Sequence, residues 1–139
     1  MNAEAAGAVY ASSDHPKAVF VIENYFLACP YCNENAANVG ELVKHYEGNN
    51  RVQVLDVGID REPSQYAEWI RRHNPNHPVL HDGKRVLTRQ LGTTHYPAAY
   101  VVDSSGEILL KTTGVWSDST QTRIRAVIDE ALLQSGEIP

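Results

Sequence analysis

The sequence predicts an α/β domain in which helices flank a mixed central sheet. An apolar segment at 18–25 and a valine-rich, alternating segment at 51–59 enclose a stretch with helical periodicity, so a strand–helix–strand unit comes first. A strand-like segment at 98–103 is followed by a Ser-Ser-Gly turn and a second such segment at 107–112, which is typical of an antiparallel hairpin. Together these units give a sheet with parallel and antiparallel pairs.

Each helix is predicted from a local pattern. Between about Pro30 and Glu47, apolar residues recur at spacings of three and four, and Gly48 follows at the expected end. Pro75 and Pro78 cannot continue a helix, so the chain must turn there. The other helices are predicted at 62–73, at 86–91 and after a cap at 117–120.

The composition is that of one ordinary globular domain. The chain has 139 residues, of which 42% are hydrophobic and 21% charged, and its net charge is -5. Because it has no basic cluster, we expect neither nucleic acid nor an anionic membrane surface as a partner. No apolar stretch approaches the ~20 residues of a membrane span. Two cysteines are too few for a scaffold held together by disulfides.

Residues 1–17 are expected to form a loose N-terminal extension, and residues 18–139 the folded domain. The first residues are small and polar, and they lack the charged-then-apolar pattern of a signal peptide. The protein is therefore either cytoplasmic or a mature domain whose leader has been removed.

Both cysteines lie in one short motif, Cys29-Pro30-Tyr31-Cys32, between the first strand and the first helix. The first thiol then stands at the N-terminus of the helix, where unpaired N–H groups and the helix dipole favour an anion. A thiolate is the form of cysteine that attacks disulfides. We therefore expect Cys29 to be the exposed, low-pKa thiol, with Cys32 shielded one turn further in.

These features resemble the thioredoxin superfamily, and within it the TlpA/ResA-like branch of thiol–disulfide oxidoreductases. Three segments carry the resemblance: the strand–Cys-Pro-Tyr-Cys–helix unit, the Tyr96-Pro97 loop with the hairpin that follows it, and the added helix with residues 78–82. The resemblance covers about residues 16–134. It implies a thioredoxin fold with an extra helix inserted in the middle of the chain.

The resemblance also implies a substrate-binding site. Pro97 matches the family's cis-proline opposite the dithiol, and the backbone of Tyr96 would pair with a bound peptide as a short strand. Pro30, Tyr31 and His95 complete the expected substrate-binding residues.

Glu23, six residues before Cys29, matches the buried acid that the family places beneath the second cysteine. We expect Glu23 to take the proton from Cys32 during the reaction. Ala28 departs from the tryptophan that the family usually has before the first cysteine. The Pro30-Tyr31 dipeptide also departs from the Gly-Pro or Pro-Pro that is more usual. Because this dipeptide tunes the redox potential, the potential and the direction of electron transfer stay open.

The expected function is thiol–disulfide exchange with protein disulfides, in the reductive direction. Cys29 attacks as a thiolate and Cys32 resolves the mixed disulfide. The expected partners are a protein with a disulfide and an upstream thiol reductant or membrane electron donor, and the protein itself is expected to be a monomer. The exchange needs no metal or organic cofactor. The resemblance implies a periplasmic or otherwise extracytoplasmic location.

Two other functions remain open. The Pro30-Tyr31 dipeptide is the one seen in glutaredoxins, which keeps a glutathione-dependent oxidoreductase as an alternative. A non-catalytic module that binds peptides and keeps its cysteines oxidised is another. A peroxidase is disfavoured because the Thr-x-x-Cys pattern is absent.

Three histidines, His73, His77 and His81, have the spacing of zinc ligands. The two prolines between them spoil a common helical face, so we expect these histidines to be solvated or to cap a turn. Other residues are expected to have only structural or solvated roles: Trp69 and Trp116 in packing, and Arg71, Arg72 and Asp82 on a solvated face.

Overall fold

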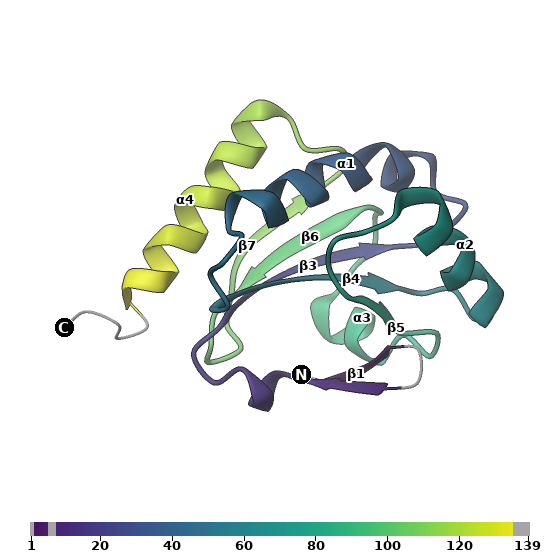
Figure 1. Cartoon of the computed structure of the whole chain (residues 1–139), viewed down its shortest axis with the longest axis horizontal. Coiled ribbons are helices and arrows are strands. Elements are labelled where there is room, and N and C mark those ends of the chain that lie inside the picture. Colours follow the sequence, from purple (N-terminus) through teal and green to yellow (C-terminus); the bar gives the residue numbers. More distant parts are fainter. Residues whose placement is uncertain (1, 6–7, 135–139) are drawn as a thin grey trace.

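The computed structural model describes residues 2–5 and 8–134. In these residues a seven-stranded mixed sheet carries helices on both faces (Figure 1). The elements in chain order are β1 (Asn2–Ala5), β2 (Ala8–Ala11), a 3-10 turn (Ser12–Asp14), β3 (Val19–Tyr25), α1 (Pro30–His45), β4 (Val52–Gly58), α2 (Pro63–His73), β5 (Val79–His81), α3 (Val86–Leu91), β6 (Ala98–Val102), β7 (Ile108–Thr113) and α4 (Asp118–Gln134).

The strand order is β2-β1-β5-β4-β3-β6-β7. Strand β4 pairs in parallel with both β3 and β5, whereas the remaining pairs are antiparallel. This confirms the predicted fold class, a mixed sheet flanked by helices. Helix α2 lies in the middle of the chain, where the added helix is predicted. Within the described ranges, no helix is long and apolar enough to cross a membrane.

The N-terminal segment differs from the expected loose extension. Strands β1 and β2 form an antiparallel hairpin, and β1 pairs with β5 through Glu4–His81 and Ala5–Leu80. The hairpin therefore extends the sheet beyond β5 (Figure 1). Where the domain itself begins stays a prediction.

Alternation along β3 divides the core between the two faces of the sheet. Val19, Val21 and the apolar side chains of α1 and α4 form one buried cluster, while Phe20 and Ile22 pack on the opposite face with Leu87 of α3. Figure 1 shows α1 and α4 on one side of the sheet and α3 on the other. The parallel strands β3 and β4 end at the same edge, and the chain enters α1 from that edge.

Candidate active site

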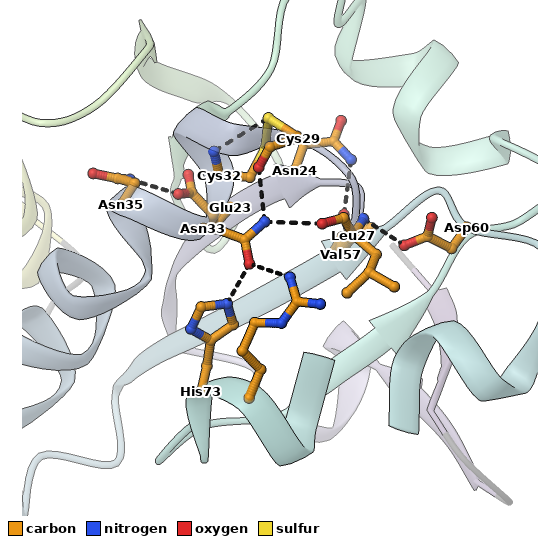
Figure 2. The surroundings of a disulfide bond; sticks show 11 residues. Glu23, Asn24, Leu27, Cys29, Cys32, Asn33, Asn35, Val57, Asp60 and His73 are labelled. Atoms are coloured by element: carbon orange, nitrogen blue, oxygen red, sulfur yellow. Dashed lines mark hydrogen bonds between the residues drawn. A yellow bond between two sulfur atoms is a disulfide. The ribbon is translucent and has the colours of Figure 1, made fainter. Parts of the chain in front are cut away.

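Cys29 and Cys32 form a disulfide bond across the first turn of α1. Cys29 is the N-cap residue, and its Sγ accepts a hydrogen bond of 3.1 Å from the backbone N–H of Cys32 (Figure 2). Pro30 occupies the first turn of the helix, where a missing N–H group costs nothing. The predicted position of both thiols at the start of a helix is therefore correct.

The expected exposure of Cys29 is wrong for the disulfide form. Cys29 is 3% exposed and Cys32 is 1% exposed. Both sulfurs belong to a buried cluster with Tyr25, Tyr66 and Trp69, and the half-buried Tyr96 packs against this cluster. Aromatic rings from β3 and α2 therefore shield the pair from the side.

Asn33 fixes the loop that leads into the helix. Its Nδ2 donates hydrogen bonds of 2.8 Å to the backbone carbonyls of Leu27 and Cys29 (Figure 2). Its Oδ1 accepts a hydrogen bond of 2.9 Å from Arg72 Nη1 and lies 2.7 Å from Nε2 of His73. The side chain thus connects α2 to the residue that carries the first thiol.

Asp60 holds the same loop from the end of β4. Its Oδ2 accepts a hydrogen bond of 2.9 Å from the backbone N–H of Leu27 (Figure 2). Burial raises the pKa of Asp60, and the bond from Leu27 opposes this rise. The loop before Cys29 is therefore held at both of its ends.

Glu23 is buried as predicted, with 2% of its surface exposed. Its Oε2 accepts a hydrogen bond of 2.6 Å from Asn35 Nδ2, whereas its Oε1 has no hydrogen-bond partner among the described residues. Burial raises the pKa of Glu23 well above its ordinary value, the bond from Asn35 lowers it, and the charge of Asp56 raises it further. The carboxyl group therefore holds a proton to a higher pH than an exposed glutamate.

Asp56 is a second buried acid that sequence reasoning missed. It is the register partner of Glu23 on the neighbouring parallel strand, and it is 3% exposed. Its Oδ2 accepts a hydrogen bond of 3.1 Å from Trp69 Nε1, and its Oδ1 lies 2.9 Å from His77 Nε2. The signal was present in the alternation of β4, where Val52 and Val54 point to the same face.

The predicted substrate-binding residues differ in their exposure. Tyr31 is 62% exposed, Pro30 and His95 are exposed, and Pro97 is buried. The Tyr96–Pro97 peptide bond is cis. The ring of Tyr96 meets that of Phe26 edge-on, with centroids 5.5 Å apart. Tyr96 also packs against the cluster that contains both cysteines, whereas Nδ1 of His95 lies 3.0 Å from Oγ1 of the neighbouring Thr94.

The three histidines with zinc-like spacing have separate contacts. His73 lies against Asn33, His77 against Asp56, and the ring of His81 stacks on Tyr66. The expectation that they are solvated or cap a turn is wrong for His77, whose side chain is buried. No group of three or more metal-ligating side chains occurs in the part of the chain that the structure describes.

The expectations for the two tryptophans and for Asp82 can also be compared with the structure. Trp69 and Trp116 are buried packing residues, as expected. Asp82, in contrast, is buried, and its carboxylate accepts hydrogen bonds from the backbone N–H groups of Leu87 and Thr88. Asp82 therefore stabilises the start of α3 and does not belong to a solvated face.

The sheet and the disulfide at the start of α1 define a thioredoxin-like fold, as the sequence predicts. More particularly, residues 2–111 match the AhpC/TSA family, and the chain belongs to that family. No match was found among curated protein sequences.

Solved structures share the whole fold. A Chlorobium tepidum protein assigned as the thiol:disulfide interchange protein DsbE has a TM-score of 0.83 and 19% identity, covering 95% of this chain and 92% of its own. A Neisseria meningitidis protein assigned as a thioredoxin has a TM-score of 0.81 and 20% identity, covering 100% of this chain and 91% of its own. A secreted Mycobacterium tuberculosis disulfide oxidoreductase homologous to E. coli DsbE has a TM-score of 0.75 and 16% identity, covering 94% of this chain and 95% of its own. At these identities the likeness establishes the fold.

Proposed function

We propose that the protein is a thiol–disulfide oxidoreductase that reduces disulfides in other proteins. The observation that carries this proposal is the Cys29–Cys32 disulfide at the N-terminus of α1, with the Cys32 N–H directed at the sulfur of Cys29. After reduction, that N–H group and the positive end of the helix dipole stabilise a thiolate on Cys29. The thiol best placed to attack is thus the first of the pair.

The reaction has two steps. The Cys29 thiolate attacks one sulfur of a substrate disulfide, a mixed disulfide forms, and the first substrate sulfur leaves as a thiolate. Cys32 then loses its proton to Glu23 and attacks the sulfur of Cys29. The Cys29–substrate bond breaks, the second substrate sulfur leaves, and the Cys29–Cys32 disulfide forms again. Glu23 suits the role of base because its raised pKa lets it hold a proton at a higher pH than an exposed glutamate does.

The surroundings of the disulfide favour a peptide substrate. Tyr31 and His95 are exposed, and Tyr96 packs against the dithiol cluster. We propose that Pro30, Tyr31, His95, Tyr96 and Pro97 contact the substrate segment that flanks its disulfide. The backbone at Tyr96 would pair with that segment as a short strand.

The cycle needs a reductant, because each turnover leaves the dithiol oxidised. We propose an upstream thiol protein or a membrane electron donor as its source, and an extracytoplasmic compartment as the site of action. One similar structure is that of a secreted disulfide oxidoreductase, which supports this location.

Single-cysteine variants test the proposal. Reduced Cys32→Ser is mixed with insulin, quenched with acid and analysed on a non-reducing gel. Since serine cannot resolve the mixed disulfide, this variant should accumulate an adduct that dithiothreitol removes. Cys29→Ser should accumulate none, and the wild type should reduce insulin with dithiothreitol as the reductant.

Three outcomes contradict the proposal. Absence of an adduct on both variants, together with a wild-type disulfide that resists dithiothreitol, indicates a peptide-binding module. An adduct on Cys29→Ser alone would reverse the roles of the two thiols. Preference of Cys32→Ser for oxidised glutathione over insulin would indicate a glutathione-dependent enzyme.

A further inference from the structure

Glu23 is enclosed on every side that the structure describes. Together with Cys32 it is almost completely buried, and α1 covers both of them. A proton that Glu23 takes from Cys32 therefore has no direct route to solvent once the disulfide has closed. Where Glu23 already holds a proton, that proton must leave before Glu23 can accept one from Cys32, and a proton must come back to Cys32 when the disulfide is reduced again.

A neighbouring pair of side chains offers that route. Asp56 lies beside Glu23 in the register of β3 and β4, and adjacent strands are about 4.8 Å apart. Oε1 of Glu23 has no hydrogen-bond partner among the described residues, and neither has Nε2 of His77, so no hydrogen bond from these residues occupies either atom. On its other side, Asp56 Oδ1 lies 2.9 Å from His77 Nε2.

Glu23, Asp56 and His77 thus follow one another in a row. At the His77 end, this row reaches a cavity of about 290 Å³ between α1 and α2. Asp56, His77 and Trp69 line its inner part. Small residues of α1 leave the space open, and exposed residues form its rim. The small residues are Ala36, Ala37 and Gly40, and the rim residues are Arg72, Asn74 and Asn76.

We propose that Asp56 and His77 are positioning residues that, with Glu23, carry the proton of Cys32 from the dithiol to the cavity between α1 and α2. This inference rests on the proposed function. Glu23 gains the proton when Cys32 attacks Cys29, and it passes the proton to Asp56. His77 takes it from Asp56 and releases it into the cavity. When the disulfide is reduced again, a proton returns along the same three groups to Cys32, and all of them are back in their starting state.

Several other charged or titratable groups face the three residues of this row. They are Tyr25 of β3, Arg72 and His73 of α2, Lys44 of α1, and Glu47 in the turn after α1. Lys44 and Glu47 line an adjoining cavity that His77 also lines. Among them, the charge of Asp56 raises the pKa of His73, while burial and Arg72 lower it. His73 contacts Asn33, and His77 contacts Asp56.

A two-step reagent separates the attack from the proton transfer. Reduced protein is mixed with 5,5′-dithiobis(2-nitrobenzoic acid) in a stopped-flow instrument. The first thionitrobenzoate leaves when Cys29 attacks, and the second leaves when Cys32 resolves the mixed disulfide. In Asp56→Asn and His77→Gln, the first release should keep its rate. The second should slow by about 10- to 100-fold and lose its wild-type pH profile, at the lower end of general acid–base effects.

Chemical rescue distinguishes a proton carrier from a packing residue. In His77→Ala, the second release should be slow and should recover when imidazole is added, since the adjoining cavity has room for a small base. His45→Gln, an exposed histidine on the far end of α1, is the matched control and should behave as the wild type.

Wild-type rates and pH profiles for the second release in both Asp56→Asn and His77→Gln would overturn the inference. So would a slow His77→Ala that imidazole does not restore. If Asp56→Asn does not fold, the His77 variants decide alone. A wild type that releases no second thionitrobenzoate, or a Cys32→Ser variant without an insulin adduct, would instead count against the proposed function itself.

Discussion

The sheet face beneath α1 is apolar at one end and carries two acidic side chains at the other. At one end, β3 and β4 pair Val19 with Val52 and then Val21 with Val54. At the other end, the next pair on the same face is Glu23 with Asp56. All six side chains are buried, so the difference does not come from solvent exposure.

The contrast separates residues that stabilise the fold from residues that serve the site. The valine end belongs to the large apolar cluster with α1 and α4, where burial contributes roughly 25 cal/mol for each Å² of apolar surface. The carboxyl end lacks this gain, and burying an acid is unfavourable unless it is neutral or well paired. Asp56 accepts a hydrogen bond from Trp69, which belongs to the aromatic cluster that contains both cysteines, so the carboxyl end adjoins the candidate site.

The largest effect is expected when the two ends are made alike. Val21→Asp places a carboxyl group at a position with no exposure and no polar partner, and should lower the free energy of unfolding by about 4 kcal/mol or more. Val21→Ala, the matched control, removes methyl groups alone and should cost roughly 2 kcal/mol. Urea unfolding at pH 7 measures both. Equal values for the two variants would show that the apolar end tolerates an acid as well as the site does.

An intermediate effect is expected at the boundary between the two ends. The Nδ2 group of Asn35 donates a hydrogen bond to Glu23 Oε2. Its Oδ1 accepts hydrogen bonds of 2.9 Å from the backbone N–H of Trp116 and of 3.0 Å from Asn38 Nδ2. Asn35→Ala leaves buried groups without partners and should cost about 2 kcal/mol of unfolding free energy. It should also raise the pKa of Glu23 further, because the Asn35 bond lowers that pKa.

Urea unfolding and the pH profile of the resolving step measure the two consequences of Asn35→Ala. The exposed Asn49→Ala is the control and should change stability by less than about 0.5 kcal/mol. A variant as stable as this control would mean that the Asn35 hydrogen bonds contribute nothing.

The smallest effect is expected from Glu23→Gln, and it depends on pH. The folded protein binds a proton on Glu23 more tightly than the unfolded chain does, because burial raises the pKa from 4.5. The wild type therefore loses stability as the pH rises above about 4.5, until it passes the folded pKa. Glutamine cannot ionise, so the variant should match the wild type near pH 4 and become relatively more stable toward pH 8.

Urea unfolding of the oxidised Glu23→Gln and wild-type proteins from pH 4 to pH 8 tests this sign. A difference that does not change with pH, or that changes in the opposite sense, would show that Glu23 titrates normally. The same variant should slow the resolving step, whereas its fold should be unharmed.

Local patterns were enough to predict most of the fold. The apolar run of β3, the helical periodicity of α1 and the Ser-Ser-Gly turn are each properties of a short segment, and the structure has elements at all three places. The N-terminal hairpin was not predicted, because its alanine-rich strands have little β propensity and depend on pairing with β5.

The site was predicted in part for the same reason. Cys29 and Cys32 lie within one motif, so their proximity follows from the sequence. The pairing of Glu23 with Asp56 depends on the register between two strands, and the contact of His77 with Asp56 depends on a turn. No local pattern fixes either distance, so the spacing of the three histidines does not reveal their separate contacts with Asn33, Asp56 and Tyr66.

Each of these two regions, the carboxyl end and the apolar end, contains one tryptophan, so the intrinsic fluorescence of the protein has a source in each. The indole of Trp69 stacks on Tyr25, with ring centroids 4.0 Å apart, in the cluster that contains the disulfide. Trp116 belongs to the apolar cluster with Val19 and Val21. Because a disulfide quenches a nearby excited indole, we expect the emission of Trp69 to change when the disulfide is reduced, and that of Trp116 to change when the apolar end unfolds. Fluorescence can therefore follow chemistry and unfolding in one sample without an attached dye.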